Sequence, residues 1–100
     1  MFRFTRTVTL KHAALTPDGI KFGKSVVAHL KKTFGHDMQL GVEIYGGTRI
    51  YWYYDFESFD KIAEMNAKLA GDKKYWTMLA GGTDLWVEGS LQDRVVRLID

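Results

Sequence analysis

The sequence predicts an α+β domain in which a strand, a helix, two strands, a helix and a strand follow one another. Three observations carry this prediction. Apolar and polar residues alternate in several segments, which is the period of a strand. In two longer segments the apolar residues recur every three or four positions, which is the period of a helix. Glycine pairs and one proline separate these segments. Because 100 residues suffice for one core, we expect one domain over residues 1–100.

The first strand and the first helix have the clearest signals. Residues 2–10 alternate as a strand with two different faces. The apolar face carries Phe2, Phe4, Val8 and Leu10. The polar face carries Arg3, Thr5, Thr7 and Thr9. The helix is predicted to begin at Thr16, to hold Pro17 in its first turn and to end at Gly35.

The middle of the chain predicts an antiparallel hairpin. Its strands are expected at 38–45 and 49–56, joined by Gly46-Gly47. The second strand is aromatic on both faces, which is unusual. One face holds Tyr51 and Tyr53, and the other holds Ile50, Trp52, Tyr54 and Phe56.

The last part of the chain predicts a broken helix and a final strand. The helix is expected to begin after Ser58 and to break at 71–72, and Gly81-Gly82 ends its shorter second piece. The last strand is predicted over 84–90, while 92–99 extends it or forms a tail that reaches a neighbouring molecule. This order of elements is that of the ferredoxin-like fold, with a four-stranded antiparallel sheet.

The second face of the sheet predicts a homodimer. In this fold both helices cover one face, and aromatic side chains left bare on the other would form a patch typical of an interface. Two such sheets packed face to face would make a barrel-like dimer. The candidates for this contact are Thr5, Thr7, Tyr45, Tyr51, Tyr53 and Trp86. The alternative is that each tyrosine lies flat with its hydroxyl group in water.

The whole chain resembles the dimeric α/β-barrel superfamily. This group of small ferredoxin-like proteins includes antibiotic-biosynthesis-type monooxygenases, NIPSNAP-like proteins and EthD-like proteins. The resemblance is carried by the length, the order of elements, the broken helix in 69–76 and the apolar tail 95–99. It implies the fold and a sheet-to-sheet dimer, and as an activity a cofactor-independent monooxygenase or isomerase-like reaction.

A pocket is predicted between the sheet and the helices, because a helix that breaks at 71–72 cannot lie flush along a sheet. Gly23 leaves room on the first helix, and Tyr75 is large enough to frame a cavity. Such a site would be mostly apolar with one cation, which is the usual composition of a small-molecule pocket. The candidates for ligand binding are Arg6, His29, Trp52, Tyr54, Asn66 and Trp76.

Arg6 is the candidate with the strongest chemical rationale. It falls on the apolar face of the first strand, and a buried guanidinium must be paired or must bind an anion. It could anchor a carboxylate, an enolate or a phenolate. It could equally form an ion pair with Glu64, Asp55 or Glu88, or turn to water at a bulge.

The sequence predicts no metal ion and no cofactor. It has no cysteine, and its three histidines lack the spacing of a metal site. The haem-degrading branch of the superfamily uses an Asn, a Trp and a haem-ligating His. Asn66 and Trp76 match two of these residue types, but that Asn should stand on the first strand, at Thr5 or Thr7, and no histidine follows His36. We therefore expect no haem.

Three functions are compatible with these patterns. The first is binding of a small apolar or aromatic molecule, with or without catalysis. The second is a structural or interaction role for the dimer alone. The third is binding of single-stranded RNA, because RNA-recognition motifs share the order of elements and place aromatic residues on the third strand. A net charge of only +2 argues against this third function. Without cysteine, an apolar leader or a membrane-spanning run, the expected location is the cytoplasm.

Overall fold

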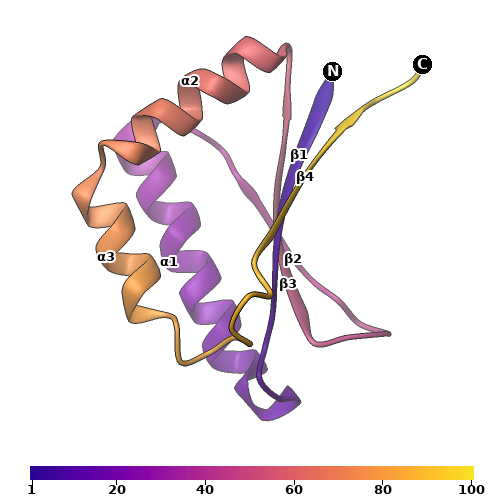
Figure 1. The fold of residues 1–100 in the computed structure, drawn as a ribbon, viewed down its shortest axis with the longest axis vertical. Coiled ribbons are helices and arrows are strands. Elements are labelled where there is room, and N and C mark those ends of the chain that lie inside the picture. The colour runs from indigo at the N-terminus through magenta and orange to yellow at the C-terminus, as the bar shows by residue number, and fades with distance from the viewer.

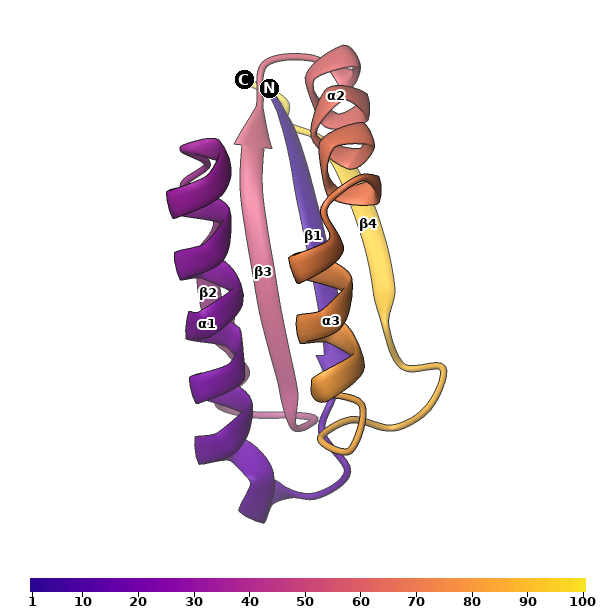
Figure 2. The same ribbon diagram turned by 90° about the vertical axis from the view of Figure 1, so that its left-hand side faces the viewer.

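The computed structural model describes residues 1–100 and shows a four-stranded antiparallel sheet with all helices on one face (Figure 1, Figure 2). The elements in chain order are β1 (Phe2–Thr9), a 3₁₀ turn (Ala13–Leu15), α1 (Thr16–Phe34), β2 (Gln39–Val42), β3 (Arg49–Phe56), α2 (Phe59–Ala70), α3 (Lys73–Gly81) and β4 (Gln92–Arg97). The order of strands across the sheet is β2-β3-β1-β4. The predicted ferredoxin-like fold is confirmed.

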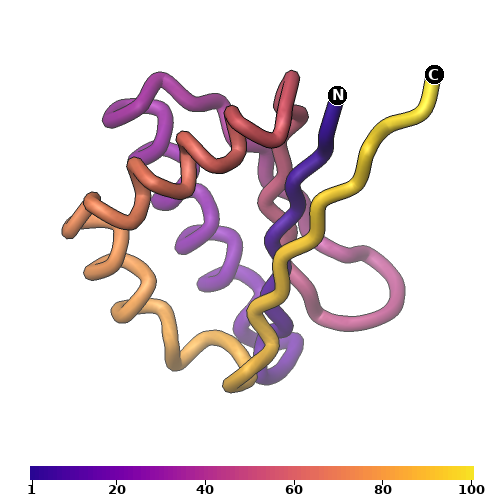
Figure 3. Tube along the Cα trace, turned by 45° about the horizontal axis from the view of Figure 1, so that its top comes forward, coloured from indigo at the N-terminus to yellow at the C-terminus, as the bar shows by residue number.

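The register of the central strands determines which residues can meet on the helix-covered face. Arg6 of β1 lies opposite Trp52 of β3 on one side and Asp93 of β4 on the other. Figure 3 shows β4 running beside β1, with both chain ends at the same end of the sheet. Arg6 and Asp93, which are 87 positions apart in the sequence, therefore become neighbours.

Helix α1 packs closely on the β2 side of the sheet because it has glycine at the contact. A Cβ atom added to Gly23 would lie 2.8 Å from a methyl group of Leu40. Leu40 thus fills the space that Gly23 leaves. The prediction that this space contributes to the pocket is wrong. The helix ends at Gly35, whose φ of 66° is the left-handed conformation that favours glycine.

The final strand was predicted in the wrong place. Residues 84–90 form a loop with an isolated bridge between Leu10 and Trp86, and β4 follows at Gln92–Arg97. Residues 84–90 suggested a strand because Leu85 and Val87 would lie on one face, opposite Trp86 and Glu88. In contrast, β4 is an exposed edge strand and therefore needs no apolar pattern. Trp86 consequently packs against Phe22 of α1, with ring centroids 5.4 Å apart, and does not lie on the open face.

The second strand is shorter than predicted. Residues 43–48 form the β2–β3 loop, so Tyr45 lies off the sheet and is 90% exposed. Tyr51 and Tyr53 do face the open side, as predicted, opposite Thr7 and Thr5 of β1.

The core lies between the sheet and the helices. Its buried apolar residues are Val8, Leu10, Val26, Leu30, Met38, Ile50, Trp52, Phe56, Met65 and Tyr75. None of the helices is both long enough and apolar enough to cross a bilayer.

Candidate functional site

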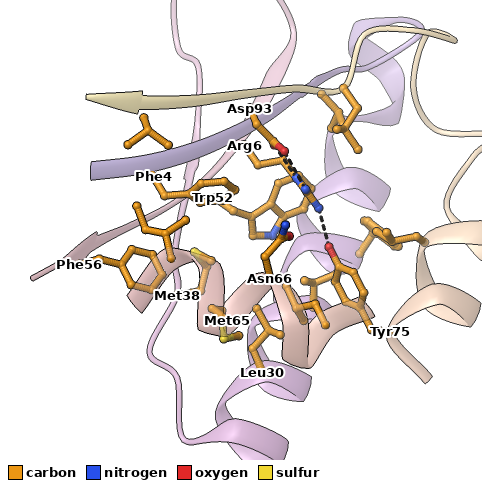
Figure 4. Close-up of a pocket in the computed structure, with 18 of the residues that line it drawn as sticks. Phe4, Arg6, Leu30, Met38, Trp52, Phe56, Met65, Asn66, Tyr75 and Asp93 are labelled. Carbon is orange, nitrogen blue, oxygen red and sulfur yellow. Dashed lines mark hydrogen bonds and ion pairs between the residues drawn. The ribbon is translucent and has the colours of Figure 1, made fainter. Parts of the chain in front are cut away.

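An apolar cavity of about 140 Å³ lies inside the core, between the sheet and helices α1, α2 and α3 (Figure 4). Hydrophobic residues make up 16 of the 19 that line it. Trp52 from the centre of β3 forms part of its wall, and its indole Nε1 donates to the carbonyl oxygen of Gly23 at 3.3 Å. Because the indole N–H is already bonded, Trp52 offers a ligand only its apolar surface.

One end of the cavity is polar and is organised around Arg6. The guanidinium donates to both carboxylate oxygens of Asp93, at 2.7 and 2.8 Å, and to the hydroxyl oxygen of Tyr75 at 2.5 Å. Figure 4 shows these contacts at the side of the pocket nearest β1 and β4. The hydrogen bonds with Asp93 raise the pKa of Arg6 above its ordinary value, so this end carries a permanent cation.

Tyr75 brings the helix layer to this polar end. Its residue is 4% exposed, and burial raises the pKa of its phenol above the ordinary value, so the hydroxyl keeps its proton. The oxygen accepts a hydrogen bond from Arg6, and the phenol proton has no acceptor within the protein. A ligand atom that accepts a hydrogen bond can therefore use this proton.

The cavity opens at the edge of the sheet where β4 lies. Among its lining residues, the exposed ones are Asn66 of α2, Leu91 just before β4, and Asp93 and Val95 of β4. The Asn66 side chain has no hydrogen-bond partner and reaches from α2 towards the polar end in Figure 4. The lining is therefore most exposed between α2 and β4.

The structure places three of the six predicted ligand residues on this pocket. They are Arg6, Trp52 and Asn66. Arg6 pairs with Asp93 and with none of the three carboxylates considered from the sequence. Its role in binding a ligand stays a prediction, because the same contacts also satisfy it as a structural ion pair.

The other three predicted residues lie elsewhere. Tyr54 turns to the end of α1, where its ring packs against that of His36 with centroids 4.1 Å apart and the planes tilted by 45°. Trp76 is 52% exposed, because α3 turns Tyr75 inward and the next residue is rotated by about 100°. Its indole N–H donates to the carbonyl oxygen of Ala70, and this hydrogen bond connects α3 to the last residue of α2. His29 is buried against Asp72, within the helix layer.

Sequence reasoning missed the chemical role of two pocket residues. Asp93 was overlooked because the last strand was placed at 84–90, with 92–99 only as its extension or a tail, so that the pairing of Asp93 with Arg6 was not expected. Tyr75 was expected only to frame the cavity, and it supplies the hydroxyl group as well. The signal available for both was Arg6 itself, since a cation on an apolar face requires partners on the neighbouring elements.

The open face of the sheet forms a second, shallow and more polar hollow of about 930 Å³. Tyr51 donates to Glu43 at 2.8 Å, and the guanidinium of Arg3 lies 5.2 Å from the ring centroid of Tyr53. Arg3 also pairs with Asp55 at 2.8 Å. Because Trp86 packs on the helix side of the sheet, the open face is less apolar than the sequence suggested.

The fold has clear relatives among solved structures. A NIPSNAP family protein of unknown function from Agrobacterium tumefaciens is 25% identical over 96% of this chain and 86% of that chain, with a TM-score of 0.75. An uncharacterized NIPSNAP domain protein from Burkholderia xenovorans is 12% identical over 99% and 95%, with a TM-score of 0.77. An antibiotic-biosynthesis-monooxygenase-like protein from Nitrosomonas europaea is 13% identical over 100% of both chains, with a TM-score of 0.72.

These relatives confirm the resemblance at the level of the fold. NIPSNAP proteins and antibiotic-biosynthesis-monooxygenase-like proteins are two of the groups that the sequence resembles, and both are ferredoxin-like. No protein-family model matches the sequence, and no curated protein matches it.

Proposed function

We propose that the protein binds a small ring compound bearing an oxygen atom, such as a phenol or an enol, in the pocket between sheet and helices. The observation that carries this proposal is an apolar cavity of about 140 Å³ with a cation and a free phenol proton at one end. An engineered apolar cavity of about 150 Å³ in another protein binds benzene, so this volume suits one six-membered ring.

The polar end favours a ligand oxygen that accepts hydrogen bonds. Three contacts of the Arg6 guanidinium are used within the protein, which leaves further N–H groups free. The phenol proton of Tyr75 is free as well, whereas both Asp93 oxygens are bonded to Arg6. An ether, carbonyl, phenol or phenolate oxygen would therefore find donors here.

The second part of the proposal is catalysis. A fixed guanidinium and a neutral phenol in an apolar site stabilise negative charge that develops on a ligand oxygen. The ligand would give its proton to Asp93, the one carboxylate of the pocket lining, or would bind already ionised. The resulting enolate or phenolate is the species that cofactor-independent oxygenation by dioxygen, or isomerisation, would require. The monooxygenase-like neighbour supports the oxygenase form of this proposal.

Binding can be tested with phenol and benzene, which have the same ring and differ by one hydroxyl group. We expect both to shift the Trp52 indole N–H resonance in NMR titrations, with phenol bound about tenfold more tightly because of its hydrogen bonds. In Tyr75→Phe the preference should fall to about twofold, because one donor is lost. Tyr53→Phe on the open face is the matched control and should behave as wild type. If neither ring compound shifts this resonance at millimolar concentration, the binding proposal is wrong.

A homodimer through the open sheet face is the second candidate function. No helix covers this face, and it combines Tyr51 and Tyr53 with charges of both signs, such as Arg3 and Asp55. A second copy related by a two-fold axis could pair these charges reciprocally.

Light scattering should then give a mass of about 23 kDa, which is twice the chain mass of 11.5 kDa. Replacing Tyr51 and Tyr53 together by Asp should yield monomer, because it would bury like charges at the sheet contact. Tyr45→Asp, in the exposed loop, is the control and should remain dimeric. A wild-type mass of 11.5 kDa at micromolar concentration would remove the dimer from consideration.

A further inference from the structure

A buried histidine–aspartate pair joins α1 to the first residues of α3. His29 of α1 is 8% exposed, and its Nε2 atom lies 2.5 Å from a carboxylate oxygen of Asp72. Its Nδ1 atom lies 3.2 Å from the hydroxyl oxygen of Thr33. Every polar atom of the imidazole is therefore partnered. The contact lowers the pKa of Asp72 below its ordinary value, so this carboxylate is ionised at neutral pH.

The position of Asp72 places this contact at the start of α3. Asp72 precedes the first residue of α3, where an aspartate normally accepts hydrogen bonds from backbone N–H groups of its own helix. Here the backbone N–H groups of Lys74 and Tyr75 contribute only weakly to lowering the pKa of the Asp72 carboxyl, and the strongest hydrogen bond of this carboxylate is the one with His29. The carboxylate thus lies at the start of its own helix and makes its principal contact with another helix.

The same helical turn carries the pocket hydroxyl. Tyr75 follows Asp72 by three positions, and residues with this spacing share one face of a helix. Asp72 points to α1, and Tyr75 points to Arg6 of β1. Because α3 is only nine residues long and follows a break, its rotation depends on contacts made in this first turn.

We propose that His29 and Asp72 are positioning residues for the pocket, and that they hold α3 in the rotation that presents the Tyr75 hydroxyl to Arg6 and to a bound ligand oxygen. His29 reaches the ligand only through Asp72 and Tyr75, and it does not line the cavity. This inference rests on the proposed function for the ligand and on the geometry of α3 for the positioning.

The test compares His29→Phe with His29→Gln. Phenylalanine keeps a ring in the core but has no N–H, whereas the glutamine amide can occupy the place of Nε2 and donate to Asp72. We expect His29→Phe to bind benzene as wild type does and to lose the preference for phenol, from about tenfold to about twofold. His29→Gln should restore most of that preference. A merely structural role for His29 would change both affinities together and would not be rescued by glutamine.

A measurement without ligand separates the positioning from the binding proposal. The Tyr75 phenol can be titrated by NMR after selective labelling of tyrosine. Its pKa is raised by burial in wild type and should return towards the ordinary value in His29→Phe, because the side chain leaves its buried place. Asp72→Ala should change the pKa of Tyr75 in the same direction. This second variant provides the test if His29→Phe does not fold.

Two results would overturn the inference. One is a Tyr75 titration in His29→Phe and Asp72→Ala that is unchanged from wild type. The other is an unchanged preference for phenol in His29→Phe. If wild type binds neither phenol nor benzene, the proposed function fails, and the Tyr75 titration still decides whether the pair positions α3.

Discussion

Replacing Trp52 by alanine should cause the largest loss of stability of any single substitution in the sheet. Trp52 is 5% exposed at the centre of β3, its ring lies edge-on to Phe22 at 6.2 Å, and its N–H is bonded to Gly23. The substitution would leave a cavity and remove the indole hydrogen bond to the Gly23 carbonyl oxygen. We expect the free energy of unfolding to fall by about 3–5 kcal/mol, measured by urea titration with far-UV circular dichroism.

The matched control for this prediction is Trp76→Ala. Trp76 is also a tryptophan with one hydrogen bond to a carbonyl oxygen, but it is 52% exposed. Its removal should cost at most about 1 kcal/mol, since little apolar surface returns to water and one exposed hydrogen bond is lost. Equal losses for the two variants would mean that burial around Trp52 does not hold the sheet to α1.

Most of the fold could be predicted from the sequence, because local signals were strong where the elements are half buried. Alternation in 2–10, Pro17 near a helix start and the break at 71–72 all correspond to observed boundaries within a few residues. The exception was β4. An edge strand needs no apolar face, so Gln92–Arg97 carries no clear period, and the apolar loop before it was mistaken for the strand.

The candidate site was predictable only in part, because its chemistry depends on contacts between distant segments. The apolar face of β1 placed Arg6 in the pocket before its partners were known. Its pairing with Asp93 requires the β1–β4 register, and its contact with Tyr75 requires the rotation of α3. Neither the β1–β4 register nor the rotation of α3 can be inferred from a local sequence pattern. The sequence therefore indicated a cation in an apolar cleft without the groups that hold it.

The other large effect is expected for Arg6→Met. Methionine fills a space similar to that of the arginine stem but cannot donate to Asp93 or to Tyr75. The Tyr75 hydroxyl would lose its bonded partner in the core, while Asp93 could still turn to water because 42% of its side chain is exposed. The loss of stability should therefore be about 1.5–3 kcal/mol, the range for hydrogen bonds to a charged group, and less than that for breaking a fully buried ion pair.

Arg3→Met is a close control because Arg3 lies on the same strand and, like Arg6, makes a bidentate ion pair with a carboxylate. Arg3 donates to Asp55 at 2.8 and 3.0 Å, but 45% of its side chain is exposed, against 20% for Arg6. Water can replace the lost contact at Arg3, so its removal should leave the urea transition close to that of wild type. Of these two variants only Arg6→Met should also lower the preference for phenol over benzene, to about twofold, because Arg6 lies at the polar end of the cavity and Arg3 does not. If Arg6→Met is destabilised and keeps the full preference for phenol of about tenfold, Arg6 is a structural ion pair alone, and Tyr75 becomes the one donor that can account for recognition of the ligand oxygen.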